Sequence, residues 1–240
     1  MKHLIYILLS IVLFTACQQD ELAPTDRKAV LELTLSRAGR PQIADTRAVD
    51  EDLAVSIYKE DGSLFLQYSA GAVPKKIVLE PGTFKVVAYT ENQETWQTAN
   101  EGRGEACYYA EASVEMEFDK IVYLTLNVPM SNYAVGLQLP DLWDTLFRSY
   151  TFTLKSGTRT TTILAGERAY FAVADGGFSY RLAATNTDNR TSYHSAIDYK
   201  DVSAGKLYTL RYSYDSDATS GGVDIIITDD MGTDDTNIDL

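Results

Sequence analysis

The sequence predicts an all-β fold, with two antiparallel β-sandwich domains in tandem. Short segments in which apolar and polar residues alternate recur along the chain, and turn-forming Gly, Pro and Asp residues separate them. Sixteen tyrosines accompany a charged fraction of only 23%, a composition that favours strands. The sequence shows no long helical period. Many short strands at such spacing are typical of sandwiches.

The first domain is expected over residues 29–130. Leu31, Leu33 and Leu35 alternate with polar residues, which predicts a half-buried strand. An Asp-Gly turn at 61–62 and a Pro-Gly turn at 81–82 separate later strands. Residues 37–52 are polar and irregular, residues 91–105 form a polar loop, and Pro129 marks a boundary. The expected strands are 30–36, 53–58, 64–68, 77–79, 83–89, 107–118 and 121–128.

The second domain is expected over residues 131–240 and repeats this style of sequence. Residues 140–147 predict one or two helical turns that begin at Pro140, where the missing N–H of proline is harmless. From residue 215 the chain is acidic, and one apolar island over 223–228 interrupts this tail. The expected strands are 134–139, 150–154, 160–164, 168–173, 178–184 and 206–214.

The first sixteen residues are typical of a secretory signal peptide, with a basic start, a short apolar run and small residues at the end. The run is too short to cross a bilayer core. Leu13-Phe14-Thr15-Ala16-Cys17 resembles a bacterial lipobox, with Phe14 where leucine is usual. We therefore expect residues 17–28 to form a lipidated linker, anchored by acyl chains such as palmitate at Cys17. An ordinary signal peptide before a cysteine is the alternative.

The four residues after this cysteine bear on localisation. Gln18-Gln19-Asp20-Glu21 resembles the export signal that sends Bacteroidales lipoproteins to the cell surface. The interpretation is an outer-membrane lipoprotein that faces the cell exterior. The alternative is the start of a solvated linker.

Composition excludes several classes of function. The chain has 21 basic and 34 acidic side chains and a net charge of −13, which argues against nucleic acid as a partner and leaves the lipid as the membrane contact. His194 is the only histidine after residue 3 and is expected in a surface loop, and no nucleophile, metal or phosphate-loop motif is present. We expect no enzyme activity, no metal and no cofactor. Residue counts alone leave a carboxylate-pair glycosidase open.

The order of several short motifs resembles the fimbrillin-like superfamily, the Bacteroidales type V pilins and their lipoprotein relatives, and in particular an uncharacterised lipoprotein branch of it. The resemblance covers about residues 29–214, and the alternative is a generic β-sandwich lipoprotein. It implies tandem transthyretin-like or Ig-like sandwiches. The matching features are the lipobox Cys17, the strand 30–36, Thr46-Arg47-Ala48, Ile57-Tyr58 with Asp61-Gly62-Ser63, Leu79-Glu80-Pro81-Gly82-Thr83-Phe84, Ala169-Tyr170-Phe171 and Ala204-Gly205-Lys206-Leu207-Tyr208-Thr209-Leu210.

The resemblance also implies a mechanism of assembly. In fimbrillins an arginine-specific protease cuts after the first strand, which leaves a groove that another subunit fills with a donated strand. Here strand 30–36 would leave, Arg47 would be the preferred cut, and Arg40 and Arg37 would compete with it. The alternative is that these arginines only solubilise a loop. The candidate donor strand lies over 223–228, with Val223, Ile225 and Ile227; it is otherwise the last strand of the second domain.

The function that follows is a fimbrial subunit or fimbrillin-like adhesin. Its expected partners are the membrane, other pilus subunits or itself, and a host or bacterial surface ligand. The rival hypothesis is a surface glycan-binding lipoprotein of a polysaccharide-uptake system. Trp96, in the polar loop 91–105, is the candidate glycan contact because tryptophan stacks on sugar rings. Trp143, between leucines on the expected helix, is expected in the core.

Overall fold

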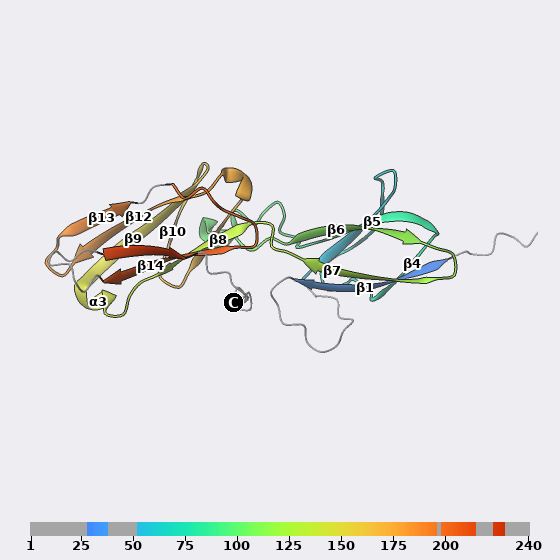
Figure 1. Cartoon of the computed structure of the whole chain (residues 1–240), viewed down its shortest axis with the longest axis horizontal. Helices are drawn as coiled ribbons and strands as arrows, with labels where there is room; N and C mark the ends of the chain where they lie inside the picture. Colours follow the sequence, from blue (N-terminus) through green and yellow to red (C-terminus); the bar gives the residue numbers. More distant parts are fainter. Residues whose placement is uncertain (1–27, 38–51, 196–197, 215–222, 229–240) are drawn as a thin grey trace, which may run out of the picture.

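The computed structural model describes residues 28–37, 52–195, 198–214 and 223–228, and it confirms the all-β sandwich fold (Figure 1). The described chain is elongated, with one set of strands at each end of the long axis. Buried apolar residues form two clusters; the first runs in sequence from Ala29 to Met130 and the second from Tyr133 to Tyr212. Each cluster fills the space between two sheets.

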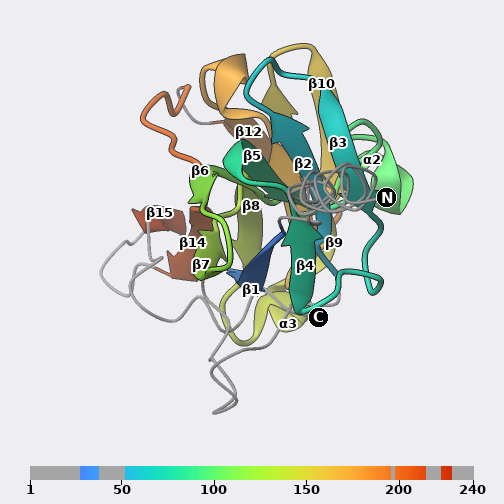
Figure 2. The same cartoon turned by 90° about the vertical axis from the view of Figure 1, so that its right-hand side faces the viewer.

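The first sandwich pairs a sheet of order β4-β1-β7 with a sheet of order β3-β2-β5-β6. Viewed down the long axis, the two sheets lie one above the other (Figure 2). Alternation explains this packing, since every second residue of each strand points into the first core. The strands are β1 (Ala29–Arg37), β2 (Ala54–Lys59), β3 (Leu64–Tyr68), β4 (Lys76–Leu79), β5 (Gly82–Tyr89), β6 (Tyr109–Met116) and β7 (Ile121–Val128).

The second sandwich has sheets of order β11-β8-β14-β15 and β10-β9-β12-β13. Adding seven to each strand number of the first sandwich gives the same neighbours, with β15 as one further strand on β14. The topology is therefore repeated although the sequence is not. The strands are β8 (Tyr133–Gln138), β9 (Phe147–Ser156), β10 (Arg159–Ile163), β11 (Arg168–Phe171), β12 (Ser179–Asn186), β13 (Thr191–Ser195), β14 (Leu207–Tyr214) and β15 (Val223–Thr228).

Three details differ from the sequence expectations. Strand β1 runs parallel to β7, and β8 runs parallel to β14, because alternation reveals which face is buried but not the direction of a neighbour. Strand β13 was not expected, and it carries His194 with an exposed side chain instead of placing it in a loop. Short helical turns at α2 (Ala99–Gly102) and η2 (Val173–Asp175) were not expected, whereas α3 (Trp143–Leu146) lies within the helical turns expected over 140–147.

Aromatic side chains dominate the second core. Trp143 is 4% exposed and stacks on Phe147 at 4.2 Å between ring centroids, so its expected place in a core is confirmed.

None of the helices in the described ranges is long and apolar enough to cross a membrane.

Two buried tyrosines of this core differ in their hydrogen bonding. The hydroxyl of Tyr133 lies 3.0 Å from Ser156 Oγ, which donates in turn to the carbonyl of Gly177, so Tyr133 is the donor. The hydroxyl of Tyr212 is buried without a hydrogen-bond partner among the described residues. Burial raises the pKa of Tyr133 to about 12 and also raises the pKa of Tyr212.

Opposite effects are expected when each hydroxyl is removed. Tyr212→Phe should raise the free energy of unfolding by up to about 1 kcal/mol, because it deletes an unsatisfied buried group, and Tyr133→Phe should lower it by about 1 kcal/mol. Urea denaturation of the two variants beside the unmodified chain measures both. Equal losses in the two variants would contradict this account.

Candidate functional site

Strand β1 is the middle strand of the sheet β4-β1-β7. It pairs in parallel with β7 over its last eight residues, from Val30 to Arg37, and antiparallel with β4 over Ala29 to Glu32. Among the described residues no strand continues the β4 side beyond Glu32. The second half of β1 is therefore held by one neighbouring strand only.

The two faces of β1 have different roles. Leu31, Leu33 and Leu35 point into the first core with exposures of 0%, 0% and 2%. Burial of each leucine contributes about 2 kcal/mol. On the outer face, the Ser36 hydroxyl donates to Asn127 Oδ1 of β7 at 2.7 Å. Removal of β1 would thus leave a hydrophobic groove flanked by unpaired backbone groups.

Arg37 was expected in an exposed loop, as a competing site of cleavage, and its expected place in a loop is wrong. Arg37 is the last residue of β1 and is 9% exposed. Its guanidinium donates to Asp52 Oδ2 at 2.5 Å and lies 5.3 Å from the ring centroid of Tyr108. An arginine held this way cannot extend into a protease. The ion pair also links the two ends of segment 38–51.

The other expected processing and anchoring residues lie outside the described residues. These are Arg40 and Arg47, in the segment between β1 and β2, and the lipobox residue Cys17. The candidate donor segment, with Val223, Ile225 and Ile227, is described in its backbone. It forms β15, which pairs antiparallel with β14 over six residues at the edge of the second sandwich.

Trp96 was expected to be an exposed glycan contact, and the structure contradicts this. It is 8% exposed and faces the guanidinium of Arg159, which lies 5.6 Å from the Trp96 ring centroid. The loop 91–105 folds against the second sandwich, so the indole is covered although its neighbours in sequence are polar. A buried indole offers no ring face to a sugar.

Arg159 joins the two sandwiches. Its Nη2 donates to the carbonyl of Gly102 at 2.8 Å and its Nη1 to the carbonyl of Tyr170 at 2.8 Å. The guanidinium also lies 5.0 Å from the ring of Phe171 in the second core. Burial lowers the pKa of Arg159. One side chain of β10 thus satisfies backbone groups from both halves of the chain.

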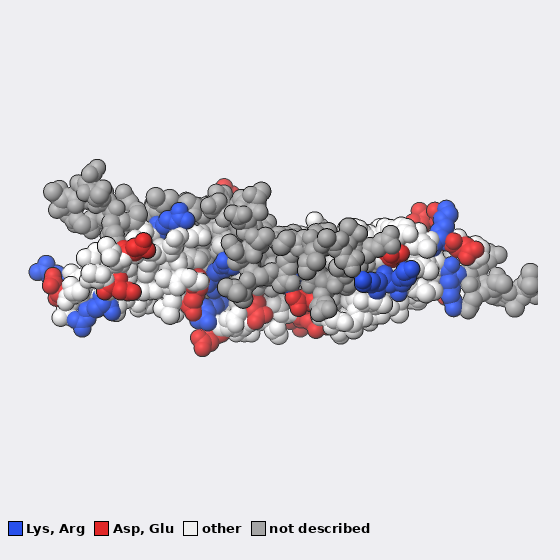
Figure 3. Space-filling model, turned by 90° about the horizontal axis from the view of Figure 1, so that it is seen from below, with Lys and Arg blue, Asp and Glu red and all other residues white. Residues whose placement is uncertain are grey.

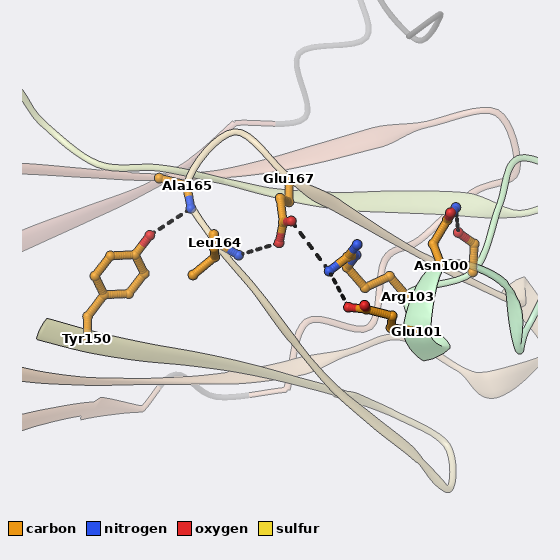
Figure 4. A network of polar contacts seen from close by, with 8 residues as sticks. Asn100, Glu101, Arg103, Tyr150, Leu164, Ala165 and Glu167 are labelled. Atoms are coloured by element: carbon orange, nitrogen blue, oxygen red, sulfur yellow. Dashed lines mark hydrogen bonds and ion pairs between the residues drawn. The ribbon is translucent and has the colours of Figure 1, made fainter.

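A polar network around Arg103, the residue that follows Gly102, extends this contact (Figure 4). Nη1 of Arg103 lies 3.4 Å from Glu167 Oε1 and 3.5 Å from Glu101 Oε2. The other carboxylate oxygen of Glu167, Oε2, accepts from the backbone N–H of Leu164. The N–H of Tyr170 donates to the carbonyl of Arg103 at 2.7 Å. The contact between the two halves therefore includes backbone as well as side-chain bonds.

The described residues include potential metal-ligand side chains and one cysteine, Cys107. No group of three or more His, Cys, Asp and Glu side chains among them could hold a metal ion. Cys107 is 2% exposed, and burial raises the pKa of its thiol, which disfavours the reactive thiolate. Basic and acidic side chains are interspersed on the face seen from below in Figure 3.

Tandem β-sandwiches built on a repeated seven-strand topology define the class of this protein. The chain belongs to the family described as a domain of unknown function, DUF4493, which it matches over residues 28–240. No functionally curated protein matches the chain.

Several solved structures are similar to this chain. Two are described as "putative cell adhesion protein". The one from Bacteroides uniformis has 15% identity and a TM-score of 0.50, and the match covers 86% of this chain and 99% of that one. The one from Bacteroides eggerthii has 13% identity and a TM-score of 0.50, and the match covers 84% of this chain and 95% of that one. The fimbrial anchor protein Mfa2 from Porphyromonas gingivalis has 13% identity and a TM-score of 0.42, with coverage of 84% and 98%. At these identities the likeness concerns the fold alone.

Proposed function

We propose that this protein is a cell-surface adhesion protein of the fimbrial type, whose subunits join by exchange of the strand at the β1 position. The observation that carries the proposal is the place of β1. It is a central, buried strand that noncovalent contacts hold between β4 and β7, and segment 38–51 connects it to the rest of the chain. The description of the two Bacteroides structures as cell adhesion proteins supports this role.

Exchange at this position is physically reasonable because the groove would be specific. A replacing strand gains backbone hydrogen bonds from two neighbours, and pockets for alternate apolar side chains fix its register. Three leucines set the required pattern, one apolar residue at every second position. A cut in segment 38–51 at Arg40 or Arg47 would sever the covalent link between β1 and β2, so that only noncovalent contacts would then hold β1 in the first sandwich.

β15 is the strand of this chain that we propose as donor. It lies at a sheet edge with β14 as its single neighbour, whereas β1 has two. Detaching an edge strand breaks one ladder of hydrogen bonds instead of two, so β15 is released more easily than a central strand. We further propose that acyl chains on Cys17 anchor the uncut chain in the outer membrane, because a cut in segment 38–51 separates Cys17 from both sandwiches. We also propose that the protein carries no enzyme activity.

Limited trypsin digestion of the purified chain with Cys17→Ser, which removes the acylation site, tests the assembly proposal. Digestion should cut in segment 38–51 while the buried Arg37 resists, and the trimmed protein should then form oligomers that survive detergent. Mass spectrometry identifies the cut, and size-exclusion chromatography follows the oligomers.

The controls separate processing from donation. An Arg40→Gln, Arg47→Gln double variant should be neither trimmed nor oligomeric. A chain that ends at residue 221 should be trimmed normally but remain monomeric, because it lacks β15. Trimmed protein that stays monomeric at high concentration would contradict strand exchange.

A further inference from the structure

The outer face of the sheet β3-β2-β5-β6 carries a hollow in which three of the six lining residues are tyrosines. Its volume is about 360 Å³, within the range of about 300–1,000 Å³ typical of ligand sites. The sheet forms the side of the first sandwich opposite β1 (Figure 2). The lining residues are Tyr58, Lys85, Val87, Tyr89, Gln93 and Tyr109.

Strand register explains how these side chains meet. Tyr89 on β5 stands opposite Tyr109 on β6, and Tyr58 on β2 stands opposite Lys85 on β5. Val87 lies between these two rows on the same face, and it is only 6% exposed although it points outward. A short side chain surrounded by larger ones produces the hollow.

The rings and polar groups around the hollow are held in place by a rigid sheet. The hydroxyl of Tyr89 accepts from Gln67 Nε2 at 3.0 Å and lies 3.1 Å from Ser56 Oγ. Tyr109 donates to Glu111 Oε2 at 2.7 Å, and Tyr109 is 41% exposed. Such prior ordering lowers the entropy that a ligand must lose on binding.

Polar groups remain available beside the rings. Among the described residues the hydroxyl of Tyr58 carries no hydrogen bond, so it can both donate and accept. Lys85 Nζ lies 3.5 Å from Glu111 Oε2 and 5.6 Å from the Tyr58 ring centroid. Lys85 is the one charged residue that lines the hollow, and the carboxylate of Glu111 beside it balances this charge.

The fold does not require this tyrosine cluster. The equivalent face of the second sandwich is formed by β9, β12 and β13. There Arg181 on β12 stands opposite Thr153, and Ala183 stands between Thr151 and Tyr193, which is the one tyrosine in these two rows of register partners. The guanidinium of Arg181 lies over the ring of Tyr193, with 4.5 Å between the guanidinium carbon and the ring centroid. The same topology therefore accommodates an ordinary polar face.

From these contacts we infer that the hollow on β2, β5 and β6 binds a neutral sugar ring of a glycan. The polarised C–H groups of a pyranose pack on the negative faces of tyrosine rings, and its hydroxyls bond to Tyr58, Lys85 and Glu111. The balanced charges of the site and the acidic chain disfavour sulfated or sialylated ligands. A neutral glycan is thus the ligand class for the adhesive role proposed above. The inference rests on that proposed role only for where the binding takes place, at the cell surface.

Affinity electrophoresis tests the inference with the purified Cys17→Ser chain in gels that contain mannan, β-glucan, xylan or galactan. At least one of these neutral polysaccharides should retard the chain. Tyr109→Ala and Tyr58→Ala should each weaken that binding at least tenfold, whereas Tyr193→Ala, the matched exposed tyrosine of the second sandwich, should leave it unchanged. Thermal melting of each variant verifies the fold.

Two results would overturn the inference: no retardation by any of these neutral polysaccharides, or binding that both tyrosine variants retain. Self-association that depends on Tyr109 would assign the face to a second copy of the chain instead. The variants should still form strand-exchanged oligomers after trimming, because β1 lies in the opposite sheet. Failure of sugar binding is thereby distinguished from failure of the proposed assembly.

Discussion

A disulfide between β1 and β7 should abolish oligomer formation without affecting proteolytic trimming. Ser36 and Asn127 are register partners on the outer face, and their side chains already lie 2.7 Å apart. With Ser36→Cys and Asn127→Cys oxidised, β1 stays covalently bound after segment 38–51 is cut, so no groove opens. We expect at least a tenfold loss of oligomers on size-exclusion chromatography, reversed by reducing agent.

A second disulfide serves as the matched control. Thr83 on β5 and Glu115 on β6 are exposed register partners in the opposite sheet, so a Thr83→Cys, Glu115→Cys pair should leave oligomers at the unmodified level. Cys107 is buried and should not interfere. If the oxidised Ser36–Asn127 variant assembles as well as this control, the incoming strand does not occupy the place of β1.

Alternation and turn chemistry predicted most of the strands because both are local. The strands at 64–68 and 121–128 have the predicted limits, and the leucines of β1 lie in the core as their period requires. Strand β13 escaped prediction because its sequence, Thr-Ser-Tyr-His-Ser, lacks an apolar alternation. Edge pairing with β12 holds it in place instead.

The candidate sites were harder to predict because they depend on contacts between distant segments. Arg37 resembles a loop arginine until Asp52 and Tyr108 are placed around it, and Trp96 resembles an exposed residue until Arg159 covers it. The tyrosine hollow had a local signal. Tyr58, Lys85 and Tyr89 occupy outward positions of strands that alternation predicted, but their convergence required the register of three strands.

Arg159→Ala should lower the free energy of unfolding more than any other single substitution proposed above. The variant leaves the carbonyls of Gly102 and Tyr170 without their charged donor and removes the packing on Trp96 and Phe171. Hydrogen bonds to a charged group contribute about 1.5–3 kcal/mol each, so we expect a loss of about 3 kcal/mol or more. Urea denaturation measures it.

The same variant should loosen the contact between the two sandwiches. Amides of loop 91–105 should lose protection from hydrogen exchange, because this loop reaches the second sandwich through Arg159.

Two further variants serve as controls. Arg159→Lys keeps the charge but cannot reach both carbonyls with a planar fork, so we expect a loss of stability smaller than that of Arg159→Ala. Arg181→Ala, which removes a guanidinium from a single exposed ring, should change stability by less than about 0.5 kcal/mol. If Arg159→Ala behaves like Arg181→Ala, the backbone bond between Tyr170 and Arg103 and the Arg103–Glu167 ion pair suffice to join the two sandwiches.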